Sequence, residues 1–158
     1  MIEAEKLRNV IYSPEFVSRL LHRFISGAQT INKEGIKFEL TYLLLPLIMN
    51  EKYRKSLENA NKNSNFSKAI LSKENHIENI FLNSYITETK QLLKQGTIYL
   101  SSYENLKIGK YISVKNAIGF KSEDSFTQEY YRASYYLGLL LSKEHYRSVF
   151  TKTKVSAI

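Results

Sequence analysis

Apolar residues recur every three to four positions along most of the chain, a pattern typical of a mainly α-helical protein. The clearest helix is predicted to begin at Ser13-Pro14, because serine is a favoured N-cap and proline fits the first helical position. The polar stretch Asn32-Lys33-Glu34-Gly35 predicts its end. Its apolar face comprises Phe16, Val17, Leu20, Leu21, Phe24, Ile25 and Ala28.

An apolar segment with a proline near its centre follows this helix. Residues Phe38 to Leu45 are expected to be helical and to kink or break at Pro46, because proline removes a backbone donor and disfavours the α conformation of the residue before it. A further short helix is expected from Ile48 to Leu57. Its basic residues would then be largely exposed.

The Asn-rich stretch 59–65 is polar and without periodicity, which predicts a loop. A chain of 158 residues is expected to form a single domain, 1–158. The same loop is the candidate boundary of a sub-division into a helical N-terminal part, 1–58, and a second part, 66–158.

The second part is predicted to begin with short helices at 66–71, 75–85 and 87–95, the last of them ending at Gly96. β-Branched and aromatic residues at 97–100 and 111–114 then predict the two strands of a β-hairpin. Helices that lead into a hairpin follow the element order of a winged helix.

Two more helices are expected near the end of the chain. Ser125 is the predicted cap of a long helix, and a short helix is expected at 145–150. The fold predicted from the whole pattern is mainly α, a helical bundle with a small β-hairpin and a winged-helix-like element.

Charge is unevenly distributed along the chain. The net charge is +8, and residues 90–121 carry six lysines against Glu104 alone. Such a patch favours a phosphate backbone or an acidic protein face as its partner. The absence of arginine from this region argues against nucleic acid, and lysines also protect the edge of a hairpin from wrong strand pairing. The candidate contact residues are Lys90, Lys94, Lys107, Lys110 and Lys115.

Two further surfaces are candidates for a protein interface. Pro46, Tyr53 and Arg54 could form a docking elbow, or Pro46 could end a buried helix while Arg54 makes a local ion pair. Tyr131 and Tyr135 belong to a tyrosine-rich helix, and tyrosine is favoured at interfaces because it is large, stiff and polar-tipped. Plain surface tyrosines are the alternative.

The sequence carries no catalytic signature. It has no cysteine, Asp124 is its only aspartate, and His22, His76 and His145 lack the spacing of metal ligands. There is no P-loop, dinucleotide-binding turn or nucleophile elbow. We therefore expect no enzyme activity, no cofactor and no metal. The longest apolar run, 43–49, is too short to span a membrane, and the first ten residues do not resemble a secretory signal, so a cytoplasmic protein without a membrane partner is expected.

Several of these features occur together in a recognisable order. They are Ser13-Pro14 before an apolar helix, Leu44-Leu45-Pro46-Leu47, Arg54, Leu57, a helix leading into Gly96, and Tyr136-Leu137-Gly138. This order resembles the middle component of three-component ABC systems. The resemblance covers about residues 12–155, and the accessory subunit of Lamassu-type anti-phage systems is one such middle component.

The resemblance implies a non-enzymatic adaptor that bridges an SMC-like ABC ATPase dimer to a nuclease-type effector in anti-phage or anti-plasmid defence. Pro46, Arg54 and Gly138 would be matching motif positions with a structural role. Double-stranded DNA would be sensed through the complex, with the basic patch contributing. The alternative interpretation is a stand-alone winged-helix DNA-binding protein or repressor, in which the patch lysines hold phosphates.

Overall fold

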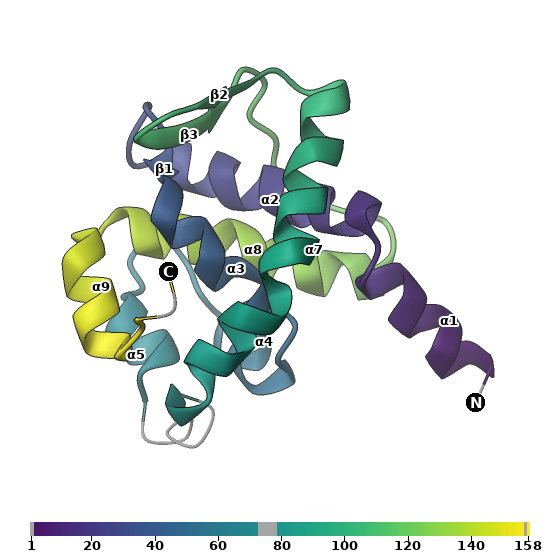
Figure 1. The fold of residues 1–158 in the computed structure, drawn as a ribbon, viewed down its shortest axis with the longest axis horizontal. Helices are drawn as coiled ribbons and strands as arrows, with labels where there is room; N and C mark the ends of the chain where they lie inside the picture. The colour runs from purple at the N-terminus through teal and green to yellow at the C-terminus, as the bar shows by residue number, and fades with distance from the viewer. Residues whose placement is uncertain (1, 73–78, 157) are drawn as a thin grey trace.

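The structure, a computed structural model, describes residues 2–72, 79–156 and 158. Most of these residues are helical, and a small antiparallel sheet lies at one end of the molecule (Figure 1). The predicted mainly α fold with a small β element is therefore confirmed. The helices are α1 (Ile2–Ile11), α2 (Pro14–Gln29), α3 (Leu44–Ile48), α4 (Glu51–Ser56), α5 (Phe66–Ile70), α7 (Leu82–Tyr103), α8 (Ser125–Ser142) and α9 (Tyr146–Thr153).

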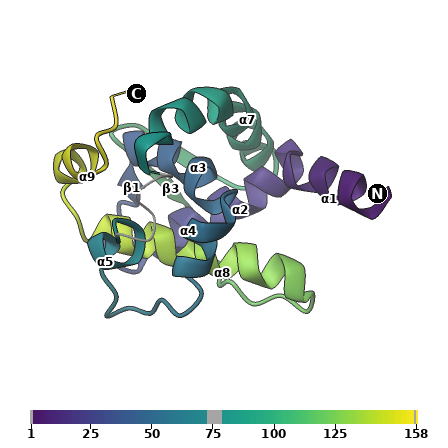
Figure 2. The same ribbon diagram turned by 90° about the horizontal axis from the view of Figure 1, so that it is seen from below.

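Helices α2 and α8 lie side by side at the centre of the molecule (Figures 1 and 2). Each contributes one glycine to their contact. A Cβ on Gly27 would lie 1.9 Å from the carbonyl oxygen of Tyr135, and a Cβ on Gly138 would lie 1.9 Å from that of Phe24. The two backbones therefore approach more closely than any side chain would allow.

The start of α2 follows the sequence prediction. Ser13 is the N-cap, and its Oγ accepts a hydrogen bond from the backbone N–H of Phe16 at 3.2 Å. Pro14 occupies the first helical position, where no backbone N–H is needed. All seven residues of the predicted apolar face are buried. The helix itself ends at Gln29, just before the predicted polar stretch.

The break predicted at Pro46 lies earlier in the chain. Residues Phe38–Leu43 form a 3₁₀ helix, and α3 begins at Leu44, with Pro46 inside its first turn. Backbone N–H groups of a first helical turn have no partner within the helix, so proline costs little there. The change of direction is therefore the step from 3₁₀ to α helix, and the proline starts a helix instead of ending one.

Helix α7 corrects two predictions made for the second half of the chain. It runs unbroken from Leu82 to Tyr103, so Gly96 does not end a helix and residues 97–100 are not a strand. Gly96 is instead the point of contact with α2, because a Cβ there would lie 2.3 Å from Cγ1 of Val17. Leu93, Gly96 and Leu100 form one buried face. This packing outweighs the strand preference of the local residues.

The sheet has three strands in the order β1-β3-β2, all antiparallel. They are β1 (Ile36–Lys37), β2 (Leu106–Ile108) and β3 (Tyr111–Val114). The second strand of the predicted hairpin is confirmed as β3, whereas its partner is β2 and not 97–100. Ile36 pairs with Ile112, and both are buried against the helices.

The remaining elements agree closely with the sequence pattern. Asp124, one residue before the predicted cap, caps α8 by accepting from the backbone N–H of Thr127 at 3.1 Å. His145 caps α9. Residues 59–65 form turns and irregular chain, and the core includes residues on both sides of them, such as Tyr53 and Phe66. The helix predicted at 75–85 begins outside the described residues, and from Leu82 it belongs to α7.

Replacing Gly138 with alanine is expected to lower the free energy of unfolding by about 2 kcal/mol, because the new Cβ would collide with the backbone of Phe24. On an exposed helix the same change would raise the free energy of unfolding by up to about 1 kcal/mol. A decrease in this free energy would therefore indicate the close helix contact. Gly119→Ala is the control, since a Cβ there meets open space. Urea denaturation measures both variants. A Gly138→Ala protein as stable as the parent would contradict the described helix contact.

Candidate functional site

The five lysines predicted to form one basic patch divide between different parts of the surface. Lys90 and Lys94 lie on α7 beside an open groove. Lys107 and Lys115 are exposed on the hairpin, in β2 and just after β3. Lys110 occupies the hairpin turn and lines a separate pocket on the side of α8 and α9. The predicted wing is therefore decorated with lysines, while the patch as a whole does not converge on one point.

The groove next to Lys90 and Lys94 has mostly apolar walls. It encloses about 400 Å³ and is lined by Phe38, Tyr42, Lys90, Gln91, Leu93, Lys94, Thr97 and Ile98. The rings of Phe38 and Tyr42 meet edge to face, with centroids 6.0 Å apart. The Nζ atom of Lys90 lies 5.7 Å from the centre of the Tyr42 ring. The lysines therefore border an aromatic depression.

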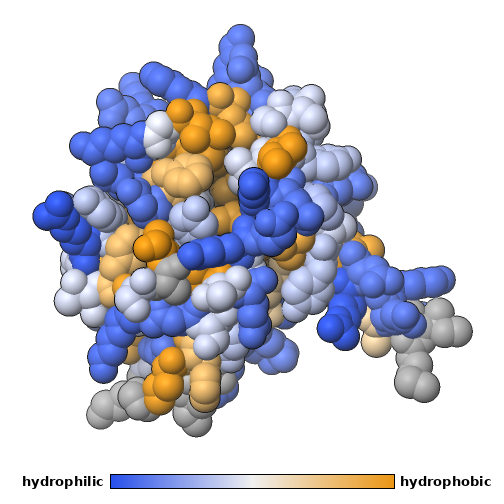
Figure 3. Space-filling model, in the orientation of Figure 1, coloured by the Kyte–Doolittle hydropathy of each residue, from blue (hydrophilic) through white to orange (hydrophobic). Residues whose placement is uncertain are grey.

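The outer side of α7 next to this groove exposes large apolar side chains. Ile98 is 61% exposed, and Tyr99 and Tyr103 are exposed beside it, their rings 6.1 Å apart. Ile108 on the hairpin is 55% exposed. Figure 3 shows orange side chains gathered in the upper part of the view, over α7 and the hairpin. We call this surface the α7–hairpin face: Lys94, Ile98, Tyr99, Tyr103, Lys107 and Ile108.

Two of the predicted interface residues lie inside the protein. Pro46 is buried in α3, and Tyr53 is 0% exposed. The hydroxyl of Tyr53 donates a hydrogen bond to the side-chain oxygen of Asn79 at 2.7 Å. Neither residue offers surface to a partner in this conformation, because both side chains are used to pack α3 and α4 onto the core.

Arg54 joins three elements of the fold. Its Nε donates to Oε1 of Glu129 at 2.9 Å, and its Nη1 donates to the carbonyl oxygen of Ile48 at 3.0 Å. The guanidinium carbon lies 4.2 Å from the centre of the Tyr130 ring. The side chain is only 11% exposed. Arg54 therefore ties α4 and the end of α3 to α8, as the local ion-pair interpretation expected.

The two tyrosines chosen on α8 differ in their surroundings. Tyr131 is buried, its ring stacked 6.3 Å from that of Phe16 and covered by the guanidinium of Arg23 at 3.9 Å. Tyr135 is half-buried, with its ring 5.1 Å from that of Phe120. Burial, with a smaller contribution from Tyr136, raises the pKa of the Tyr135 hydroxyl. Of the two, only Tyr135 keeps appreciable surface for a partner.

His22 and Glu104 form a buried polar contact that sequence reasoning did not single out. Nε2 of His22 donates to the carbonyl oxygen of Asn116 at 2.8 Å and lies 3.8 Å from Oε2 of Glu104. Burial acts to raise the pKa of Glu104, but hydrogen bonds from Asn116 and Asn105, with the charge of His22, outweigh it and lower that pKa. The carboxylate thus holds the chain after β3 against α2.

The described residues hold neither a metal-binding cluster nor a membrane-spanning helix. Residues 2–72, 79–156 and 158 contain no group of three His, Asp or Glu side chains placed to bind a metal ion. Within the same ranges, no helix has both the length and the apolar content that crossing a bilayer requires. His76 lies outside the described residues.

The described residues form a mainly helical protein with large apolar side chains exposed on α7 and the hairpin. The chain matches, over residues 1–156, the family model described as ABC-three component (ABC-3C) system Middle Component 3. It therefore belongs to this family, and the resemblance seen in its motifs is confirmed. As a middle component it is an accessory subunit that works with protein partners. A comparison with curated proteins and another with solved structures found no match.

Arg54→Ala is expected to destabilise the protein by about 2 to 3 kcal/mol, because it leaves the carbonyl of Ile48 without its donor and removes the bond to Glu129. Lys55→Ala is the matched control on the same helix, since Lys55 is exposed and solvent screens its pair with Glu51. Thermal denaturation of the two variants gives the comparison. Equal stability of the two variants would instead support the interpretation of Arg54 as part of a docking surface.

Proposed function

We propose that this protein is a non-enzymatic adaptor that connects an SMC-like ABC ATPase dimer to a nuclease-type effector in a cytoplasmic anti-phage or anti-plasmid defence complex of the Lamassu type. The observation that carries the proposal is the α7–hairpin face of a chain whose family works in a multi-component system. Several large apolar side chains exposed on a small protein favour a site of protein contact.

The residue types of the α7–hairpin face suit a protein partner. Tyrosines such as Tyr99 and Tyr103 bury a large area on binding and lose little conformational freedom, so they recur at the energetic centres of interfaces. Ile98 and Ile108 add purely apolar area. Lys94 and Lys107 border this centre, so an acidic rim on the partner would complement it and speed association.

Helix α1 is a second element that suits a partner. It projects from the body of the protein in both views (Figures 1 and 2). Residues 3–10 are exposed, including Leu7 and Val10. A ten-residue helix without tertiary packing is marginal in water, so α1 gains stability if a partner covers it.

Side chains that could serve acid–base chemistry are committed to the fold, which supports a non-enzymatic role. Asp124 caps α8, His145 caps α9, and His22 and Glu104 hold the segment after β3. If any of these side chains took part in catalysis, the fold would lose a structural hydrogen bond.

A stand-alone DNA-binding protein is the second candidate, and the topology favours it. With η1 (Phe38–Leu43), α4 and α5 set aside, the order α2-β1-α3-α7-β2-β3 and the strand order β1-β3-β2 resemble those of a winged helix. Helix α7 would then be the helix that enters the major groove. However, α7, all of whose residues are described, carries one fully exposed lysine, Lys94, beside neutral Gln91, Gln95, Ile98 and Ser102. A helix that binds phosphates and base edges would be more cationic, so protein contact is favoured.

Ile98→Asp is expected to weaken binding to the ATPase subunit by about tenfold or more, because it places a charge in the centre of the apolar face. Thr87→Asp is the control, an equal charge change at an exposed position near the start of α7. Titration calorimetry with the purified ATPase measures both, and circular dichroism checks that both are folded. A folded Ile98→Asp protein with unchanged affinity would remove α7 from the interface.

Affinity for duplex DNA distinguishes the adaptor from the stand-alone DNA-binding protein. We expect the isolated chain to bind a short duplex only non-specifically, with a dissociation constant of about 10⁻⁴ to 10⁻⁶ M that weakens with salt. Fluorescence anisotropy with several duplex sequences measures this. Nanomolar, sequence-dependent binding that is abolished by joint replacement of Lys107, Lys110 and Lys115 with glutamate, yet kept by Ile98→Asp, would establish the DNA-binding protein instead.

A further inference from the structure

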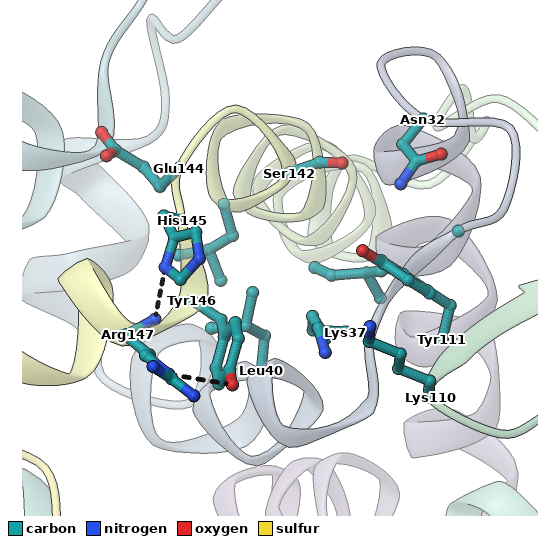
Figure 4. A pocket seen from close by; sticks show the side chains of 13 residues that line it. Asn32, Lys37, Leu40, Lys110, Tyr111, Ser142, Glu144, His145, Tyr146 and Arg147 are labelled. Atoms are coloured by element: carbon teal, nitrogen blue, oxygen red, sulfur yellow. Dashed lines mark hydrogen bonds between the residues drawn. The ribbon is translucent and has the colours of Figure 1, made fainter.

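A polar pocket lies between the sheet and the helices α8 and α9, on the side that the proposed adaptor surface does not use. It encloses about 450 Å³. Its walls come from β1, the hairpin turn, the end of α8 and the start of α9 (Figure 4). Segments more than a hundred residues apart in the chain therefore meet here.

Three cationic side chains line this pocket: Lys37 from β1, Lys110 from the hairpin turn and Arg147 from α9. None of them forms an ion pair with a carboxylate in the part of the chain that the structure describes. Figure 4 shows the ends of Lys37 and Lys110 pointing into the space between Tyr146 and Tyr111. Positive charges that gather without a counter-ion repel one another, and an anion between them would relieve that repulsion.

Aromatic rings contact two of these cations, Lys37 and Arg147. Nζ of Lys37 lies 4.5 Å from the centre of the Tyr146 ring and 5.3 Å from that of Tyr111. Nε of Arg147 donates a hydrogen bond to the hydroxyl of Tyr146 at 3.2 Å. Rings position a cation without neutralising its charge. Lys37 and Arg147 are thus held in position before an anion binds.

The net charge of the pocket stays positive when its other charged groups are counted. Glu144 is its one carboxylate, and Oε2 of Glu144 lies 3.6 Å from Nζ of Lys152, which offsets its charge. The first turn of α9 adds the partial positive charge of a helix N-terminus, while the last turn of α8 adds carbonyl groups of opposite sign. The side chains of Lys37, Lys110 and Arg147 therefore decide the preference for an anion.

We propose that this pocket binds the phosphate group of a small phosphorylated ligand. Lys37 and Lys110 reach into one space, and Arg147 lines the pocket on the other side of the Tyr146 ring. Cations on more than one side suit a tetrahedral dianion, whose oxygens point to several sides, better than a single planar carboxylate. The volume lies within the range of small-molecule sites, about 300 to 1,000 Å³, and exceeds what one phosphate fills. Tyr111 and Tyr146 offer ring faces to a base, so a nucleoside monophosphate fits the remaining space.

Calorimetry of the whole chain in phosphate-free buffer tests this with three probes: inorganic phosphate, adenosine 5′-monophosphate and adenosine. Both phosphates are expected to bind and adenosine is not. Tighter binding of the nucleotide identifies a nucleoside phosphate as the source of the group, and equal binding identifies free phosphate. No binding of either phosphate at about 1 mM would overturn the proposal.

Three variants establish where the phosphate binds. Lys37→Met and Arg147→Met are each expected to weaken phosphate binding by about tenfold. Lys107→Met is the control, since it removes the same charge from the same hairpin outside the pocket. Thermal denaturation confirms that the variants are folded. Unchanged binding by folded Lys37→Met and Arg147→Met, or equal weakening by Lys107→Met, would overturn the proposed site. This result is independent of whether the chain binds an ATPase.

Discussion

The close contact of α2 with α8 is the constraint on which the rest of the structure depends. Gly27 and Gly138 each lie against a carbonyl group of the other helix, so the two backbones touch twice. On another side of α2, Val17 packs onto Gly96 of α7. With α2 held between α8 and α7, Ile98, Tyr99 and Tyr103 of α7 keep exposed side chains. The packing of small residues inside the molecule thus determines which apolar surface remains outside it.

That surface gives the adaptor proposal its physical basis. A middle component has to bind proteins without losing its own fold, so the residues that hold the fold and the residues that meet partners should be distinct. Arg54, Glu104 and His22 are engaged in internal contacts, whereas Ile98, Tyr99 and Ile108 contribute little to the core. The cationic pocket around Lys37 is separate from both groups, and it offers a route by which a small anion could be sensed by the same subunit.

Local signals in the sequence predicted those parts of the fold that local chemistry decides. Ser13-Pro14 starts a helix because the cap and the proline act within one turn. The strand prediction for residues 97–100 is wrong, because Thr, Ile and Tyr favour strands locally, whereas the packing of Gly96 on Val17 requires a helix. Of the candidate site residues, Lys107, Lys110 and Lys115 lie on the hairpin, and their role in binding stays a prediction. The meeting of Lys37, Lys110 and Arg147 could not be predicted, because no periodicity relates three segments so far apart.

Hydrogen–deuterium exchange of the chain, alone and bound to the ATPase of its own system, tests the central claim most directly. The account predicts that binding slows exchange in residues 91–103 and 106–114, which carry the α7–hairpin face, and in α1. Protection confined to α4 and α8, with α7 and the hairpin exchanging as in the free chain, would contradict it.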